Sequence, residues 1–286
     1  MTTDTQTAIA DAEADALAII TPVATHYQLA KQTLLAGKDV LVEKPLAQSV
    51  EECEELAALA DEKKRILMVG HVFKFNPGVK YVKELLQDGT VGRVISLHAI
   101  RTNLGPVRSD ANALWDLGAH DLSIFNYWLE TLPVSVTASG LAHLSPEQED
   151  TVVANYQYPD GVMATIYTSW LHPRKVREIT VVGELKMVVW NDMDLNEPVR
   201  IYDKGVDRQE DYADTFGAFR LILREGLVTI PPVGGKEPLT SECEHFVECV
   251  LKRERPLTDA QDGLAVVRAL AAASRSMRSN STSVCF

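Results

Sequence analysis

The sequence predicts an α/β fold: an incomplete Rossmann-like domain built on a parallel sheet, followed by an α+β domain with a large, mostly antiparallel open sheet. Before Gly92, short runs that are apolar on both faces alternate with helical patterns, as in a parallel sheet covered by helices. After Gly92, several segments alternate apolar and polar residues with the two-residue period of a sheet that has one covered face. With 286 residues, of which 46% are hydrophobic, the chain has material for two ordinary domains, which we place at residues 1–92 and 93–286.

The first domain reads as strand, helix, strand, helix, strand. Pro22 ends the first strand, and Gly37 is placed to cap the first helix. Ser49 with Glu52 matches a capping box at the start of the second helix. Short units of this kind join parallel neighbours through a helical crossover. The five elements are expected at residues 15–21, 25–37, 39–42, 49–64 and 66–69.

The second domain contains five clear strand patterns, interrupted by one helix and followed by two more. The interrupting helix is expected over residues 116–130, and the later helices over 241–252 and 260–277, where we expect them to pack back on the first domain. An open sheet with one apolar face needs a cover, so we expect a homo-oligomer formed through this sheet. The strands are expected at residues 94–101, 151–158, 162–170, 178–183 and 186–190.

Composition excludes several classes of protein. A formal net charge of −12 at pH 7 opposes binding to nucleic acid, whose affinity for proteins comes largely from clustered Lys and Arg, although a local basic cluster can still bind a small anion. No apolar run is long enough to cross a bilayer, and the first residues lack the basic start and apolar centre of a secretory signal, so we expect a cytoplasmic protein without a membrane partner. The four cysteines have no CxxC spacing, so neither a metal site nor a disulfide framework is predicted.

Polar residues follow the predicted strands of the first domain. In an open α/β sheet, ligands bind outside the carboxyl ends of the strands. A lysine held there and partly desolvated has a lowered pKa, which makes Lys44 a candidate proton or hydrogen-bond donor to a substrate oxygen; the alternative is a solvated surface lysine. We also predict a cis Lys44–Pro45 bond, because tight strand exits are where such bonds occur. The polar strand ends are Thr21-Pro22, Glu43-Lys44-Pro45 and residues 71–77.

A second candidate pair lies in the stretch WDLGAHDLSIFNYWL, residues 115–129. If the helix begins near Asp116, then Asp116 and His120 are four residues apart and share a face, so the carboxylate can orient or charge the imidazole. Asp121 would then point elsewhere. The alternative is a helix-capping aspartate beside a satisfied histidine, and the spacing alone does not choose between the two.

Two further polar clusters look like pocket material. Guanidinium groups can clamp phosphate or carboxylate through two hydrogen bonds, which favours an anionic ligand on this otherwise acidic protein. The alternative is ordinary loop charge. The members of these clusters are Arg101, Asn103 and Arg108 ahead of the predicted helix, and Trp170, Lys175 and Arg177 at the end of a strand.

Several of these stretches together resemble the glucose-fructose oxidoreductase, inositol dehydrogenase and rhizopine catabolism (Gfo/Idh/MocA) family. The resemblance is carried, in order and spacing, by ITPVATHYQLAKQTLLAGKDVLVEKPLA, GHVFKFNPGVKYVKELL and WDLGAHDLSIFNYWL, and it covers essentially the whole chain. It implies hydride transfer between a sugar or polyol carbon and NAD or NADP. It also implies an open sheet that forms the substrate pocket and often an oligomer interface. A finer likeness to enzymes of nucleotide-linked acetamido sugars is carried by RTNLGPVRSDANALWDL and SWLHPRKVREITVVG.

The resemblance also implies roles for individual residues. Lys44 would be the catalytic lysine, His120 the acid/base that takes the hydroxyl proton, and Asp116 its orienting partner. Thr21, Pro22, His26 and Glu43, together with Lys44, would lie around the nicotinamide ribose. The candidates for the sugar, its carboxylate or the diphosphate are Arg101, Asn103, Arg108, Trp170, Lys175 and Arg177.

One part of the family pattern is missing from this sequence. The family's first strand runs into a G-x-G-x-x-G turn that holds the pyrophosphate, and no such turn occurs among the 286 residues. We therefore expect a truncated first domain, which leaves binding of NAD or NADP by this chain open. The alternatives are an incomplete sequence, a partner that covers the open sheet, and a redox-inactive protein that binds sugars or serves in assembly. A glycosidase that retains tightly bound NAD is a further alternative, but it too would need the missing turn.

Overall fold

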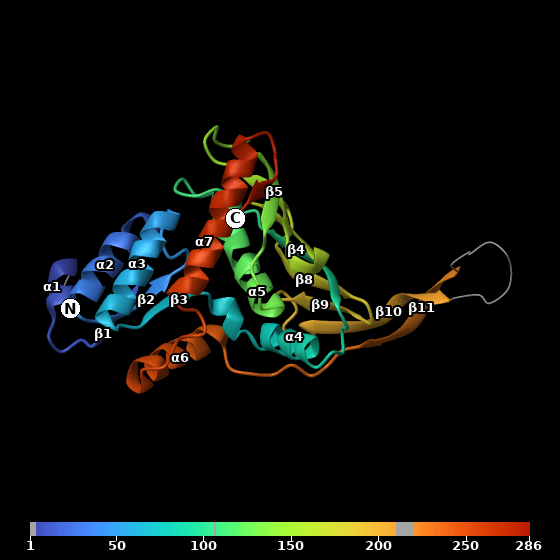
Figure 1. Ribbon diagram of the computed structural model, residues 1–286, viewed down its shortest axis with the longest axis horizontal. Coiled ribbons are helices and arrows are strands. Elements are labelled where there is room, and N and C mark those ends of the chain that lie inside the picture. Colours follow the sequence, from blue (N-terminus) through green and yellow to red (C-terminus); the bar gives the residue numbers. More distant parts are fainter. Residues whose placement is uncertain (1–3, 106, 210–219) are drawn as a thin grey trace.

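The computed structural model describes residues 4–105, 107–209 and 220–286, and it contains two sheets (Figure 1). One has three strands and the other nine. The three-stranded sheet is parallel, and the nine-stranded sheet is antiparallel except between β4 and β7. This architecture confirms the predicted fold class.

The three-stranded sheet has the order β1-β2-β3. Ile19 pairs with Val42, and Val42 pairs with Val69, so the carboxyl ends of all three strands meet at one edge. The Ser49 hydroxyl accepts a hydrogen bond from the Glu52 main-chain N–H at 3.2 Å, as the predicted capping box requires. The elements of this region are α1 (Thr5–Ala10), β1 (Ala16–Ile19), α2 (His26–Leu35), β2 (Asp39–Glu43), α3 (Val50–Lys63) and β3 (Leu67–Gly70). The short helix α1 has no counterpart in the sequence prediction.

Both faces of this small sheet are covered, which explains its continuous apolar strands. Val40 and Val42 belong to the core formed with α2, α3 and α7 (Ala260–Arg278). Leu41 faces the other way, into a smaller cluster with Met68 and Phe246 of α6 (Pro238–Lys252). The helices at the end of the chain therefore lie against the first sheet.

The nine-stranded sheet has one covered face and one open face. Buried Ala164 and Ile166 alternate with the more exposed Met163 and Thr165 along β7, as the two-residue period predicts. Its strand order is β11-β10-β9-β8-β4-β7-β6-β5-β12. The strands are β4 (Val94–Thr102), β5 (Ser135–Leu141), β6 (Thr151–Gln157), β7 (Met163–Ser169), β8 (Val176–Gly183), β9 (Met187–Asn191), β10 (Val199–Gln209), β11 (Arg220–Thr229) and β12 (Val284–Cys285).

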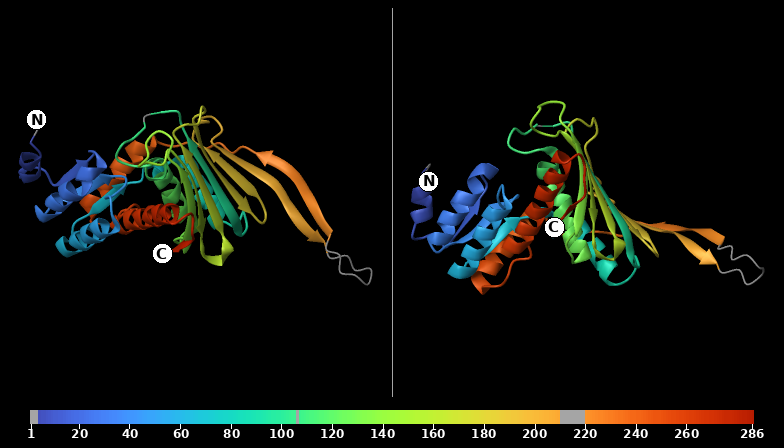
Figure 2. Two further views of the ribbon diagram at one scale, coloured as in Figure 1. Left: turned by 90° about the horizontal axis from the view of Figure 1, so that it is seen from above. Right: turned by 45° about the horizontal axis from the view of Figure 1, so that its top comes forward.

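Helices α4 (Pro77–Gln87), α5 (Ala119–Leu129) and α7 contribute to the core on the covered face. Helix α7 contacts α3 and β3 on one side and α5 and β5 on the other, so it joins the two sheets. Strands β10 and β11 pair and extend away from the rest of the sheet as an arm (Figure 2). The sequence pattern ended this sheet near residue 205 and did not predict β11.

In the described parts of the chain, no helix is both long and apolar enough to cross a membrane. The same parts hold no group of three or more His, Cys, Asp or Glu side chains arranged to hold a metal ion.

Candidate active site

The carboxyl ends of β1, β2 and β3 form the edge on which the site is built. Glu43 pairs with Gly70, so the residues that follow, Lys44 and His71, lie next to each other along this edge. The Lys44–Pro45 bond is cis, as predicted.

Lys44 is not a solvated surface lysine. Its ammonium Nζ donates a hydrogen bond to the main-chain oxygen of Asp116 at 2.7 Å and lies 3.6 Å from the Asp116 Oδ1. Only 14% of its side chain is exposed. Burial lowers the pKa of Lys44, although the carboxylates of Asp116 and Glu43 act in the opposite direction. The lysine can therefore donate a proton or a strong hydrogen bond more readily than an ordinary one.

Asp116 lies in a π-helical turn, Leu114–Gly118, that runs directly into α5. Its Oδ2 accepts a hydrogen bond from the Trp170 indole Nε1 at 3.2 Å, and its Oδ1 lies 3.7 Å from the Arg108 Nη1. Among the described residues, no hydrogen bond joins Asp116 to His120. The Asp116 carboxylate faces Lys44 instead, and its expected role as the orienting partner of His120 stays a prediction.

The His120 imidazole packs edge-on against the Phe73 ring, with the ring centres 4.9 Å apart. Its Nδ1 is shielded from solvent and has no hydrogen-bond partner within the described residues. Burial lowers the pKa of His120 well below its usual range, and the positive charges of Lys44 and Arg101 lower it further. His120 is thus a neutral imidazole with a free nitrogen, which is the form that can accept a proton.

Arg101 and Asp121 form a buried ion pair beside His120. The Arg101 Nη2 lies 2.7 Å from the Asp121 Oδ1, and its Nε contacts both carboxylate oxygens at 3.1 Å. Arg101 is 3% exposed, and its guanidinium carbon lies 4.6 Å from the centre of the Phe73 ring. Asp121 thus points inward as the partner of Arg101. The Nε and Nη2 of Arg101, a predicted substrate residue, are therefore engaged within the protein.

The other predicted substrate residues divide into three groups. Arg108 and Trp170 are brought to Asp116, and Arg108 also pairs with Asp110 at 2.7 Å. Arg177 lies near the Phe73 ring, 6.0 Å from its centre, and pairs with Asp192 at 3.0 Å. Lys175 is exposed, and the main-chain N–H of Asn103 bonds to the Ser169 oxygen at 3.0 Å. Neither Lys175 nor Asn103 contacts Lys44 or His120 within the described ranges.

His26 ties two strand ends together. Its Nε2 lies 2.9 Å from the main-chain oxygen of Thr21, and its Nδ1 lies 2.8 Å from that of Pro45. The side chain is 1% exposed, so it holds the shape of the edge from within. Thr21 and Pro22 themselves are exposed at the end of β1.

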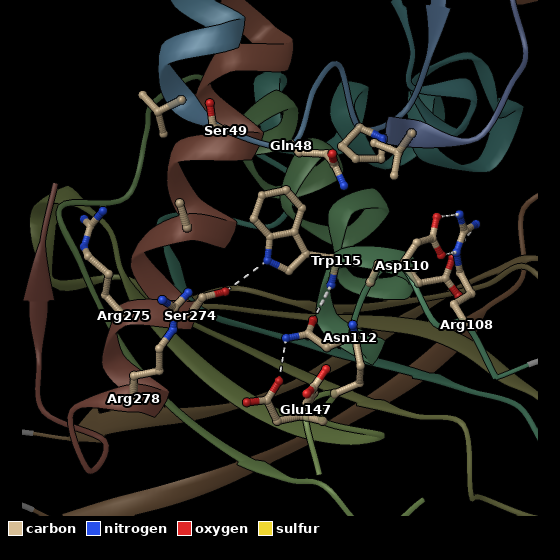
Figure 3. A pocket seen from close by; sticks show the side chains of 18 of the residues that line it. Gln48, Ser49, Arg108, Asp110, Asn112, Trp115, Glu147, Ser274, Arg275 and Arg278 are labelled. Carbon is tan, nitrogen blue, oxygen red and sulfur yellow. Dashed lines mark hydrogen bonds and ion pairs between the residues drawn. The ribbon is translucent and has the colours of Figure 1, made fainter. Parts of the chain in front are cut away.

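A cleft of about 750 Å³ opens beside Lys44 and Pro45 (Figure 3). Its other walls are the start of α3, the segment 108–116, the loop 146–149 and the last turns of α7. Trp115 is fixed in this cleft because its indole Nε1 donates to the Ser274 hydroxyl of α7 at 3.0 Å. Sequence reasoning missed Trp115 and the α7 residues, because no local spacing relates positions so far apart in the chain.

Comparison with known proteins assigns this fold to a class of NAD-binding oxidoreductases and to one family within it. Residues 1–71 match the model of the oxidoreductase family with an NAD-binding Rossmann fold, and residues 79–189 match the GFO/IDH/MocA C-terminal domain. The chain is 30% identical over 268 residues to UDP-N-acetylglucosamine 3-dehydrogenase of Acidithiobacillus ferrooxidans, covering 92% of this chain and 77% of that protein. The chain therefore belongs to the Gfo/Idh/MocA family of oxidoreductases.

Two further relatives agree with this assignment. Inositol 2-dehydrogenase 2 of Saccharopolyspora erythraea is 32% identical, but the match covers 55% of this chain and only about half (48%) of that protein. The crystal structure of GenD2 from gentamicin A biosynthesis, in complex with NAD, has a TM-score of 0.81 and 26% identity, with 100% of this chain and 82% of that chain covered.

The residues expected around the nicotinamide ribose are compatible with such a cofactor. Thr21 and Pro22 are exposed at the same edge that presents Lys44. His71, 1% exposed at this edge, has two ring nitrogens without a hydrogen-bond partner in the described part of the chain. Buried polar atoms are nearly always satisfied, so these nitrogens are available to a ligand or to water. The sequence holds no G-x-G-x-x-G turn for the pyrophosphate, so the fit is limited to the nicotinamide end.

Replacing Asp121 by Asn should destabilise the protein strongly, because it leaves the buried Arg101 guanidinium without its counter-charge. We expect the free energy of unfolding to fall by about 3–5 kcal/mol. Urea denaturation followed by circular dichroism measures this change. The matched control is Glu184→Gln, which removes an exposed ion pair with Arg93 and should cost no more than about 1 kcal/mol. Equal effects of the two substitutions would contradict the account of the buried pair.

Stability should decline with acidification partly through His71. Burial lowers the pKa of His71 to about 3, and the Lys74 and Lys44 charges add to this shift. The unfolded chain, with a histidine pKa of about 6.5, takes up the proton first as the pH falls, so the stability from neutral His71 is lost between about pH 6.5 and pH 3. Within this window His71→Gln should reduce the slope of unfolding free energy against pH by about 1.4 kcal/mol per unit. An unchanged slope would show that His71 is protonated or exposed in the folded protein.

Proposed function

We propose that this protein oxidises a secondary hydroxyl of a sugar or nucleotide-linked sugar, with NAD as the acceptor. The observation that carries the proposal is Lys44, held at the carboxyl end of β2 against Asp116 with a lowered pKa and beside a large cleft. Two relatives support the proposal, since their names describe dehydrogenation of UDP-N-acetylglucosamine and of inositol.

The bound nicotinamide would supply the hydride acceptor. His120, neutral and packed beside this edge, accepts the hydroxyl proton of the substrate as general base. Lys44 donates a hydrogen bond to the same oxygen and stabilises the negative charge that develops on it as the proton leaves. Thr21, Pro22 and Glu43 would border the nicotinamide ribose, and His26 supports this edge from below. In this scheme Asp116 positions Lys44.

Trp170 and Arg108 hold the Asp116 side chain in place. Both contact the Asp116 carboxylate, which limits the positions that this side chain can adopt. Arg101 and Arg177 lie near the Phe73 ring that packs against His120, and their positive charges add to burial in keeping the base neutral. Asp121 serves as the counter-charge of Arg101. Asn103 and Lys175, at strand ends, remain proposed substrate contacts.

Replacing Lys44 by Met should remove activity while leaving the fold intact. Met fills a similar volume but cannot donate to the substrate oxygen, and loss of such a group costs roughly 10²–10⁴-fold in turnover. NADH formation with UDP-N-acetylglucosamine and with myo-inositol measures activity, and NADH fluorescence measures cofactor binding. We expect unchanged NADH affinity with turnover lost.

Normal turnover in the Lys44→Met variant would refute the role of the lysine. Wild-type protein that binds a sugar but gives neither NADH formation nor a saturable NADH fluorescence change would refute the proposed oxidation. That second result would favour a redox-inactive sugar-binding or assembly protein, an alternative motivated by the missing glycine-rich turn.

We also propose that the open face of the large sheet pairs with a second copy of the chain. Ile100, Val153 and Met163 are each 39% exposed on this face. The facing residues lie on adjacent strands, since Ile100 and Val153 both pair with Tyr167 of β7. An apolar face of this kind is usually covered in a stable protein.

Replacing Val153 by Glu should weaken this association, because the interface would have to bury a charge. Sedimentation analysis should show an oligomer for the wild type and a smaller species for the variant at the same concentration. Leu35→Glu, at an exposed position of α2, is the matched control and should sediment like the wild type. A monomeric wild-type protein would contradict the proposal.

A further inference from the structure

Two arginines line the cleft beside Lys44. Arg275 and Arg278, on the last turns of α7, both line this cleft, and Figure 3 shows them on its α7 wall. Within the described residues neither guanidinium makes a hydrogen bond or ion pair, whereas the other cations of the cleft, Lys44 and Arg108, are paired with carboxylates. Charged groups that line a cleft without a partner are candidates for ligand contacts.

The residues of α7 that line the cleft make it long. Ala271, Ser274, Arg275 and Arg278 all line it, and their separations of three, four and seven residues place them on one face of α7. A rise of 1.5 Å per residue gives a wall of about 10 Å along the helix. Trp115 is bonded to Ser274 in the middle of this wall. A ligand that reaches from Lys44 along such a wall is larger than one sugar ring.

The charge of the wall selects an anionic group. Arginine presents a planar set of donors that matches phosphate oxygens through paired hydrogen bonds. The lining also carries Glu51, Asp110, Asp116, Glu147 and Glu149, but none of them pairs with Arg275 or Arg278 within the described residues. Asp110 and Asp116 pair with Arg108 and Lys44, and Glu149 accepts from the Asn112 amide at 2.8 Å. The two guanidiniums therefore form a local pair of donors on α7.

We propose that Arg275 and Arg278 bind the diphosphate of a nucleotide-linked sugar whose sugar ring lies at Lys44. This inference rests on the proposed function and narrows its substrate to the nucleotide-linked class. It differs from the expectation drawn from the sequence. There, the arginines among the candidates for the sugar, its carboxylate or the diphosphate were Arg101, Arg108 and Arg177. A cofactor also carries a diphosphate, so the test must separate the two sources.

Calorimetric titration of the full chain with UDP, UDP-N-acetylglucosamine and free N-acetylglucosamine provides the test. Arg275→Gln and Arg278→Gln should each weaken UDP and UDP-sugar binding about tenfold, and the double variant roughly 100-fold, because each removes a charged hydrogen-bond donor. Binding of free N-acetylglucosamine should be unchanged. Arg268→Gln is the matched control, since Arg268 lies on the same helix, pairs with Glu54 and does not line the cleft. Thermal melts of all variants show whether each is folded.

Four outcomes decide the inference, and the first three would overturn it. Wild-type binding of UDP that the double variant retains would show that the arginines do not hold the diphosphate. Loss of NADH affinity in the variants, with UDP affinity intact, would assign them to the cofactor. No UDP binding by the wild type, together with NADH formation from an unmodified sugar, would overturn this inference and leave the proposed oxidation standing. UDP binding lost in the double variant without any NADH formation would support the inference and refute the oxidation.

Discussion

The hydrogen bond from the Lys44 ammonium to the Asp116 main-chain oxygen is the contact on which the site depends. It joins the end of β2 in the small sheet to the turn that starts α5, under the large sheet, across 72 positions of the chain. A lysine at the end of a parallel strand would ordinarily extend into water. Here the turn removes it from solvent, and the lost hydration lowers its pKa. The same contact thus joins two parts of the site and prepares the lysine for chemistry.

A second set of contacts governs the histidine. Phe73 lies at its centre, with the His120 ring on its edge and the Arg101 guanidinium against it. The buried Asp121 compensates Arg101, so a positive charge can sit near the imidazole at a tolerable cost. Burial and neighbouring cations together favour the neutral base. Lys44 lies beside carboxylates and His120 beside cations, and such different surroundings are how acid and base roles are separated in an active site.

The sequence predicted features that depend on neighbours in the chain. The strands of the small sheet were found from runs apolar on both faces, the start of α3 from Ser49 and Glu52, and Lys44 from its place after a strand. The spacing of Asp116 and His120 predicted neither the π-turn at Leu114–Gly118 nor the contacts of Asp116 with Lys44 and Trp170, which come from distant parts of the chain. The partners of Arg101 and Trp115 lie far away in sequence or across the fold, and local spacing carries no information on such contacts.

Lys44 has a lowered pKa because the Asp116 turn takes it out of water. The most direct measurement is a pH titration of the lysine side-chain carbons by NMR in ¹³C-labelled protein, with the Lys44 signal assigned from its absence in the Lys44→Met variant. The account predicts a midpoint below the ordinary lysine value of about 10.4. A midpoint at or above that value would show that the ammonium is solvated or is held by its carboxylate neighbours, and it would contradict the role proposed for the lysine.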